Sequence, residues 1–348
     1  MQLKNLNLLF LFTTLLFFAC SEKSNLTGSQ NPDLWSIPSD EVFSGGPGKD
    51  GIPSVDSPNF ISPAEVNFLN NEDLVVGIVV NDEARAYPHE ILDWHEIVND
   101  DIGDVSVALT YCPLTGTAIG WNRNVNGMQT TFGVSGKLYN TNLIPYDRQT
   151  DSYWSQISMS CVNGELINTV IETYPVIETT WGTWKAMYPN TKVMNTDTGF
   201  NRNYGQYPYG DYRTNHNNII FPVNPKDDRL PAKERVLGVL ENGSNKAFSI
   251  NEFETPKVIE ENIGGRELVI IGSKTDNFIV AFYNNGLNNL SINFDNFPVI
   301  AIDEAGNQLD ISGKIVAGPL ANSTLESPTA FIGYWFSFGA FYPGIGLN

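Results

Sequence analysis

Apolar and polar positions alternate along much of the chain in short runs, which is the pattern of β-strands rather than of long helices. Leu74–Val80 is a β-branched apolar run, Asn81–Glu83 is a turn, and Ala84–Tyr87 returns, so this segment predicts a β-hairpin. A second hairpin is predicted from Val105–Tyr111 and Thr117–Trp121. The first elements of the chain are therefore expected to be paired antiparallel strands.

Helical spacing occurs in only a few places. Ile91, Trp94 and Val98 recur at intervals of three and four residues and predict a short helix, with Asn99–Gly103 as its end. His95 lies three residues before Val98, which turns it toward the apolar side of that helix. A histidine on an apolar face is a core residue or a functional one.

The pattern is repeated later in the chain. The segment from Val75 resembles the segment from Val236, and the ends of the two copies, TWGTWKAMYPNT and YWFSFGAFYPGI, also match. Similarity over more than a hundred residues is better explained by duplication than by chance. We therefore expect an α+β fold, mostly β, with two tandem repeats of hairpins that each end in a short helix. The matched positions are Gly77 with Gly238, Ala86 with Ala247, Ile102 with Ile263, Gly103 with Gly264, Trp181 with Trp335, and Ala186 with Ala340.

The two copies differ in residues that carry chemistry. Features that both keep are expected to be scaffold, and features that only the first has are candidates for function. His95 aligns with Pro256, and Cys112 aligns with about Lys274. Subtracting the second copy from the first leaves His89, His95 and Cys112 as candidates. Cys112 ends a strand beside a turn, where rigid scaffolds often present reactive groups.

The N-terminal segment predicts where in the cell the protein is located. Lys4, the apolar run Leu8–Phe18 and the small residue before Cys20 have the order of a secretory signal, and Cys20 is placed like the lipidated cysteine of bacterial lipoproteins. The alternatives are an ordinary signal peptide and a short membrane anchor. The expected location is the cell envelope of a bacterium, on the periplasmic or outer-membrane side, with the lipid on Cys20 holding the chain to the membrane.

The net charge of the chain limits the kinds of binding partner that we expect. The chain of 348 residues has 20 basic and 39 acidic residues, a formal net charge of −19. Such a charge repels phosphate backbones, so nucleic-acid binding is not expected. The predicted organisation is a signal peptide over residues 1–19, a flexible tether over 20–50, repeat one over 51–195, a Tyr- and Pro-rich connector over 196–235, and repeat two over 236–348.

Several stretches identify a family. RAYPHEILDWHEIVND, VALTYCPLTGTAIGWNR, TFGVSGKLYNTNLIPYDRQTDSYWSQ and DDRLPAKERVLGV resemble domain-of-unknown-function family 3179, which occurs in secreted and lipid-anchored bacterial and archaeal proteins. The resemblance implies no activity. Thr115 stands where many similar proteins have a second cysteine. The resemblance draws attention, as ligand-binding candidates, to Ser135, Asn140, Asn142, Asp147, Arg148, Trp154 and Gln156.

Three functions are compatible with these residues. The first is a metal or thiol redox site, in which His95, Cys112 and His89, with Met159 as a further ligand, hold copper, zinc or iron. The second is a non-catalytic module that binds an envelope glycan or protein partner. In the third, a hydrolase or acyltransferase, Cys112 is the nucleophile, His95 lowers its pKa, and Asn140 or Gln156 steadies an oxyanion.

A purely structural role for the same residues is the competing interpretation. In that case His95 is a hydrogen-bonded core histidine and Cys112 is a packed thiol. Cys161 is either a small buried residue or a disulfide partner of Cys112.

Overall fold

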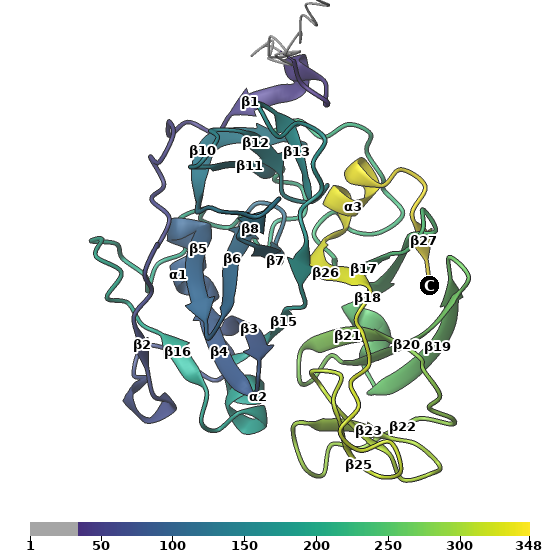
Figure 1. Cartoon of the computed structure of the whole chain (residues 1–348). Coiled ribbons are helices and arrows are strands. Elements are labelled where there is room, and N and C mark those ends of the chain that lie inside the picture. The colour runs from purple at the N-terminus through teal and green to yellow at the C-terminus, as the bar shows by residue number, and fades with distance from the viewer. Residues whose placement is uncertain (1–33) are drawn as a thin grey trace, which may run out of the picture. The chain divides into compact units, whose positions relative to one another are not determined.

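The computed structural model describes residues 34–348, whose backbone is mainly extended, as the α+β, mostly β prediction requires (Figure 1). The predicted signal peptide, Cys20 and the first part of the predicted tether lie outside the described residues. The helices of the described part are α1 (His89–His95), α2 (Trp181–Met187) and α3 (Trp335–Phe341), with the 3₁₀ turns η1 (Ser39–Glu41), η2 (Pro63–Glu65) and η3 (Ile250–Phe253).

Two sheets share one plan. In each, a hairpin is flanked on one side by the antiparallel strand that leads into a closing helix, and on the other by a short parallel strand that follows this helix. The first sheet has the order β15-β3-β4-β16-β2 and the second β26-β17-β18-β27. Their strands are β2 (Phe60–Ile61), β3 (Leu74–Val80), β4 (Glu83–Pro88), β15 (Ile177–Thr180), β16 (Lys192–Met194), β17 (Arg235–Leu240), β18 (Lys246–Ser249), β26 (Thr329–Tyr334) and β27 (Gly346–Leu347).

The second hairpins lie in two further antiparallel sheets. One has the order β14-β7-β6-β5 and the other β19-β20-β21. The β6–β7 hairpin is the one predicted around Cys112. The strands are β5 (Ile97–Ile102), β6 (Val105–Cys112), β7 (Thr117–Asn122), β14 (Thr173–Tyr174), β19 (Lys257–Ile263), β20 (Arg266–Ser273) and β21 (Phe278–Tyr283).

The remaining strands have no counterpart between the two halves. They form a five-stranded sheet, a four-stranded sheet and a two-stranded ribbon within residues 34–348. The first contains β1 (Val42–Ser44), β10 (Phe132–Tyr139), β11 (Asn142–Asp147), β12 (Tyr153–Ser155) and β13 (Ser160–Asn163); the second contains β22 (Ser291–Ile292), β23 (Val299–Ile302), β24 (Gln308–Asp310) and β25 (Ile315–Ala317); the ribbon pairs β8 (Asn124–Val125) with β9 (Met128–Gln129).

The matched glycines allow each closing helix to approach its hairpin. A Cβ on Gly77 would lie 2.1 Å from the ring of Trp184 in α2, and a Cβ on Gly238 would lie 2.0 Å from the ring of Phe338 in α3. Real Cβ atoms do not come this close to other heavy atoms, so only glycine permits these contacts.

Hydrophobic cores join the two halves of the chain. Trp184 of α2 and Val75 of β3 belong to one core with Phe278 and Val280 of β21. Conversely, Phe338 of α3 shares a core with strands of the first half, including β6, β7 and β10. Each closing helix thus packs in a core to which the other half contributes, while two further cores lie within the first half with the connector and within the second half.

The helix expected to extend to Val98 ends earlier. It stops at His95 because Glu96 adopts a left-handed backbone with φ 58°. Ile97 and Val98 then begin β5, which pairs with β6 along its whole length. Helical spacing was misleading here because β-branched residues at those positions also suit a buried strand.

The described part of the predicted tether, residues 34–50, makes contacts with the rest of the fold. Val42 and Phe43 pair with β10, and Trp35 stacks on Tyr153 with ring centroids 5.7 Å apart. The connector agrees better with expectation, since residues 195–234 contain no helix or strand.

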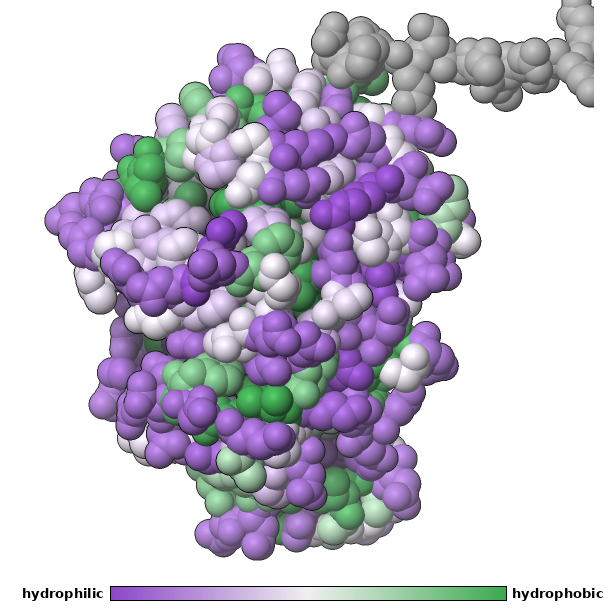
Figure 2. Space-filling view, turned by 90° about the vertical axis from the view of Figure 1, so that its left-hand side faces the viewer, coloured by the Kyte–Doolittle hydropathy of each residue, from purple (hydrophilic) through white to green (hydrophobic). Residues whose placement is uncertain are grey.

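The surface carries many polar side chains. Hydrophilic residues predominate on the face shown in Figure 2, with apolar residues scattered between them. In residues 34–348, no helix combines the length and the apolar character needed to cross a membrane.

Candidate functional site

His95 is fully buried and both of its ring nitrogens have partners. Nδ1 lies 2.7 Å from the carbonyl oxygen of Pro53, which can only accept, so Nδ1 carries the proton and donates it. Nε2 then accepts a hydrogen bond from the hydroxyl of Tyr204, also at 2.7 Å. Burial lowers the pKa of His95, although the bond to Pro53 opposes this. The contacts of His95 are those of a neutral core histidine, and neither nitrogen is directed at Cys112.

Cys112 is the last residue of β6 and is almost completely buried. Its Sγ lies 3.8 Å from the carbonyl oxygen of Thr141. Burial, followed by the nearby charge of Glu96, raises the pKa of Cys112 to about 11, while hydrogen bonds from Thr115 and from the backbone of Leu143 act in the opposite direction. The sulfur is a neutral thiol at neutral pH, and its contact with the Thr141 carbonyl oxygen, which can only accept, favours this protonated form.

Glu96 is the ionisable group whose charge acts on the pKa of this thiol. It caps α1 in the left-handed conformation, where glycine or asparagine is usual, and its side chain is buried. Burial raises the pKa of Glu96 to about 8, although a hydrogen bond from Tyr209 at 3.4 Å opposes the shift. A buried carboxyl with a pKa near 8 can both give and take a proton at physiological pH.

The turn between β10 and β11 completes the surroundings of the thiol. Tyr139 pairs with Asn142, and the two residues between them, Asn140 and Thr141, both have positive φ, at 48° and 67°. This is the geometry of a tight two-residue hairpin turn, in which glycine usually takes the second position. The β-branched Thr141 is unfavourable there, yet this conformation places its carbonyl oxygen on the sulfur of Cys112.

The connector covers this region. Tyr204 contacts His95, Tyr209 contacts Glu96, and the hydroxyl of Tyr212 donates to the carbonyl oxygen of Leu114 at 2.8 Å. These tyrosines of the connector therefore cover the thiol and its neighbours. We refer to Cys112, Glu96, Thr115, Thr141 and Tyr209 as the thiol site.

The ligand-binding candidates fall into separate groups. Asn142 and Gln156 belong to one closed buried network with Thr115 and Thr117, in which the Asn142 amide lies 2.7 Å from the Gln156 carbonyl oxygen. Because the Gln156 amide donates to Thr110 and to the carbonyl of Thr117, it has no donor left for an oxyanion.

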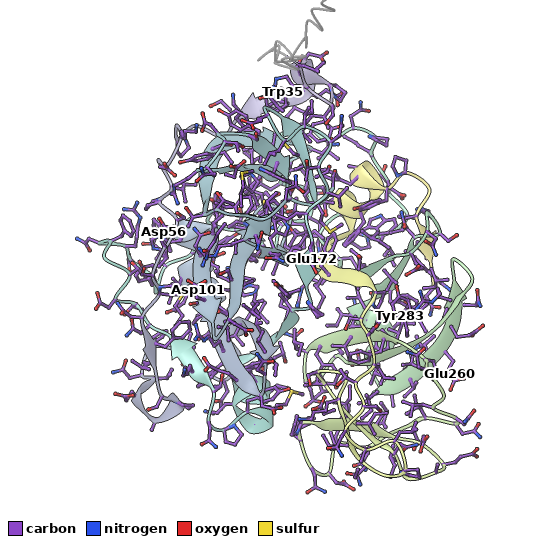
Figure 3. All side chains as sticks on the ribbon, viewed as in Figure 1. Trp35, Asp56, Asp101, Glu172, Glu260 and Tyr283 are labelled. Atoms are coloured by element: carbon purple, nitrogen blue, oxygen red, sulfur yellow. The ribbon has the colours of Figure 1, made fainter. Side chains whose placement is uncertain are left out.

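Other candidates make structural contacts. Asp147 caps a turn at Thr150 and accepts from the indole of Trp154 at 3.0 Å. Arg148 pairs with Asp50 and with Asp56, which is labelled in Figure 3. The Ser135 hydroxyl donates to the carbonyl oxygen of Ile144. The Asn140 carbonyl accepts from the backbone of Asn224, and its buried amide nitrogen has no hydrogen-bond partner in the described structure.

His89 lies in a different cluster, which sequence reasoning largely missed. Its Nδ1 is 3.1 Å from the hydroxyl of Tyr111, and its Nε2 is 3.5 Å from Glu178. Glu178 also pairs with Arg235 of the second half, while Asp93 pairs with Arg213 of the connector. Burial is the largest influence and raises the pKa of Glu178, but the charges and hydrogen bonds of Arg235 and His89 together outweigh it, and the pKa lies below its usual value. This cluster ties α1, β15, the connector and β17 together.

The structure does not gather the predicted metal ligands. His89, His95 and Cys112 have separate partners, and Met159 packs in a hydrophobic core. Among the residues that the structure describes, no three histidine, cysteine, aspartate or glutamate side chains are placed to hold a metal ion. Cys112 and Cys161 are both free and buried.

Sequence reasoning also missed Glu96, although it is adjacent to His95. No spacing rule marks it, because it lies in a left-handed turn whose backbone carbonyl accepts from Tyr111 near the end of β6. Its sequence signal would have been a charged residue at the end of a helix with no glycine to terminate it.

Comparison with known proteins gives one result. The family model described as a protein of unknown function, DUF3179, matches residues 49–345. No curated protein and no solved structure matches the chain.

Proposed function

The chain belongs to the DUF3179 family, whose description names no reaction, and we propose from the geometry that it is a cell-envelope enzyme of acyl transfer or hydrolysis. In this proposal Cys112 is the nucleophile and Glu96 is the group that takes its proton. The observation that carries the proposal is that two residues in the unfavourable left-handed region, Glu96 and Thr141, act on one buried thiol: the Thr141 carbonyl oxygen lies 3.8 Å from the Cys112 sulfur, and the charge of Glu96 influences the pKa of the thiol. Such strain persists only where the surrounding structure enforces it, and it is concentrated at functional sites.

We prefer a nucleophilic thiol to a metal site because of the contacts of His95 and Cys112. To bind a metal, His95 would have to give up a hydrogen bond to Pro53 or to Tyr204. At Cys112, in contrast, hydrogen bonds from Thr115 and from the backbone of Leu143 act to lower the pKa of the thiol, although burial outweighs them. These donors favour negative charge on the sulfur, which is what a nucleophilic thiol requires.

Each proton transfer of the proposed reaction can be assigned to a group. The Cys112 sulfur attacks the carbonyl carbon of a small ester or thioester, and the thiol proton passes to the ionised Glu96. The tetrahedral intermediate expels the alkoxide or thiolate, which takes the proton back from Glu96, and an acyl thioester remains on Cys112. Water, deprotonated by Glu96, then attacks that carbonyl, and the thiol leaves with the proton. Because Tyr209 and Tyr212 cover the site, the connector must move aside before a substrate can enter.

We also propose that the two halves arose by duplication, since their sheets have the same order and their glycines make the same approach to a closing helix. The strand ends then match Cys112 with Ser273 rather than with Lys274. The matched Gly103 and Gly264 lie equally far before Cys112 and Ser273, so the match with Lys274 is one residue too late. Only the first half has a thiol at this position, which supports its functional role.

The proposed location is the bacterial cell envelope, with a lipid on Cys20. The test compares the full-length chain with Cys20→Ser in cells fed a clickable fatty acid. Wild type is expected in the membrane fraction with the label, and the variant in the soluble fraction without it. A labelled variant, or wild type without label, would show the proposal to be wrong.

The catalytic proposal is tested with p-nitrophenyl acetate. After short incubations at several pH values, peptide mass spectrometry measures acetylation of Cys112, with the buried Cys161 as an internal reference. Wild type is expected to be acetylated at Cys112 faster than at Cys161, with a rate that rises as Glu96 ionises near pH 8. Glu96→Gln is expected to lower that rate at least about a hundredfold, the lower end of what a general base contributes.

Glu90→Gln is the matched control, because Glu90 is a carboxyl of the same helix whose pKa is raised by burial to about 7. It should leave the rate unchanged. Equal rates in wild type and Glu96→Gln, or no excess of Cys112 over Cys161, would refute the assignment of Glu96 and Cys112.

A further inference from the structure

A cavity of about 330 Å³ lies between the two halves of the chain, away from the thiol site. One wall is the segment 171–176, which contains β14, and the other is the segment 327–331 at the start of β26. A smaller cavity of about 120 Å³ adjoins it and shares Tyr174–Val176 and Ser327–Pro328. In Figure 1 this is the region where β7 and β26 lie close together.

The wall at residues 327–331 is the start of β26, on the side of the strand that faces away from β17. Within residues 34–348, β26 is the last strand of its sheet, with β17 as its partner. The amide of Tyr334 donates to the carbonyl of Thr115, so it points away from β17. Since orientation alternates along an antiparallel strand, Ala330 also directs its N–H and C=O away from β17. Ala330 lines both cavities, so these groups face the space between the halves.

The wall at residues 171–176 also includes a strand edge that faces the cavity. β14 is the last strand of its own described sheet and pairs with β7. The carbonyl of Glu172 accepts from the amide of Asn122 in β7, so by alternation Thr173 directs its N–H and C=O to the other side. Thr173 lines the larger cavity. Two strand edges therefore present unpaired main-chain groups to one cavity.

We propose that this cavity is a docking site for an extended segment of another protein, which adds as a strand to the free edge of β26. An exposed strand edge supplies main-chain hydrogen bonds to any extended peptide, and the walls select its side chains. The walls combine apolar residues such as Ile119 and Phe331 with the polar residues Glu172, Thr173 and Thr329, so the cavity suits a segment that presents both apolar and polar side chains.

Charge defines the rest of the partner. Glu172, which is labelled in Figure 3, stands at this cavity, and the whole chain has a net charge of −19. The docked segment therefore alternates apolar and polar residues and carries lysine or arginine beside the inserted part. This inference is independent of the thiol site.

The test begins with a displayed library of random linear peptides selected on the intact protein. The selected peptides are expected to alternate apolar and polar residues and to carry positive charge. Their affinity is then measured by fluorescence anisotropy against wild type, Ala330→Pro and Ala330→Ser. Proline removes the outward N–H without removing a bond to β17, and serine keeps it at similar size. Ala330→Pro should weaken binding about fivefold or more, as the loss of one main-chain hydrogen bond implies, and Ala330→Ser should not.

Hydrogen exchange on the wild type keeps the test valid if the proline variant fails to fold. The amide of Ala330 should become protected when a selected peptide is added. Equal affinity for a folded Ala330→Pro, an unprotected Ala330 amide in the complex, or a library that yields no binder would each overturn the proposal. A glycan that binds the cavity without protecting Ala330 would do so as well.

Discussion

Replacement of Glu96 by glutamine should change how the stability of the fold depends on pH. Glutamine has the shape of the protonated acid and keeps an oxygen for the hydroxyl of Tyr209. It cannot ionise. Comparison of the two proteins therefore isolates the free energy of holding one carboxyl neutral inside the fold.

The magnitude follows from the shift of the pKa of Glu96 from 4.5 to about 8. Between these values the unfolded chain has released the proton and the folded chain still holds it, so raising the pH favours unfolding. One group in this state lowers the free energy of unfolding by about 1.4 kcal/mol for each pH unit. The total over the window from pH 5 to pH 8 is about 4 kcal/mol, a large part of the stability of a typical domain.

The assay is denaturant unfolding of wild type and Glu96→Gln at intervals from pH 5 to pH 9. The advantage of the variant should be smallest at pH 5, grow up to about pH 8, and then level off. Glu254→Gln, at an exposed carboxyl paired with Lys274, serves as the control and should show no such growth. A difference between wild type and Glu96→Gln that is constant across this range would refute the raised pKa and, with it, the proposed proton acceptor.

Three other substitutions test the fold. Arg235→Met leaves Glu178 buried without its guanidinium partner and should lower the free energy of unfolding by about 2–4 kcal/mol, reduced from the full buried-pair value because Arg235 is partly exposed. Gly238→Ala places a methyl group 2.0 Å from the ring of Phe338 and should destabilise by about 3 kcal/mol, measured by thermal unfolding. Thr141→Gly relieves a left-handed β-branched residue and should raise the stability by about 1 kcal/mol; a loss of stability would mean that the turn is not strained.

Most of the hairpins could be predicted from the sequence, because alternation of apolar residues is a local signal. The strands around Asn81–Glu83 and Cys112 were located to within one or two residues. The end of α1 was not, since it depends on Glu96 adopting a conformation that the residue itself disfavours. The cores shared by both halves could not be predicted either, because no local sequence pattern indicates that Trp184 and Phe278 belong to one core.

For the site, the sequence identified positions better than partnerships. Cys112 was correctly placed at a strand end, and His95 was correctly turned toward the core. Their pairing was inferred only from residue type and closeness in the chain. In the structure His95 is bound by Pro53 and Tyr204, which lie far away in sequence. Long-range partners of this kind leave no periodic pattern.

The position of the connector affects the protonation of the residues in the thiol site. Cys112 and Glu96 are desolvated because Tyr209 and Tyr212 cover them, and this burial is the main reason why their pKa values are raised. If the connector moves aside to admit an acyl group, water enters as well and both pKa values fall toward their ordinary range. Entry of the substrate would then ionise Glu96 at the moment when it must act as a base. When the connector closes again, the carboxyl takes up a proton, which on this mechanism it obtains from the thiol of Cys112.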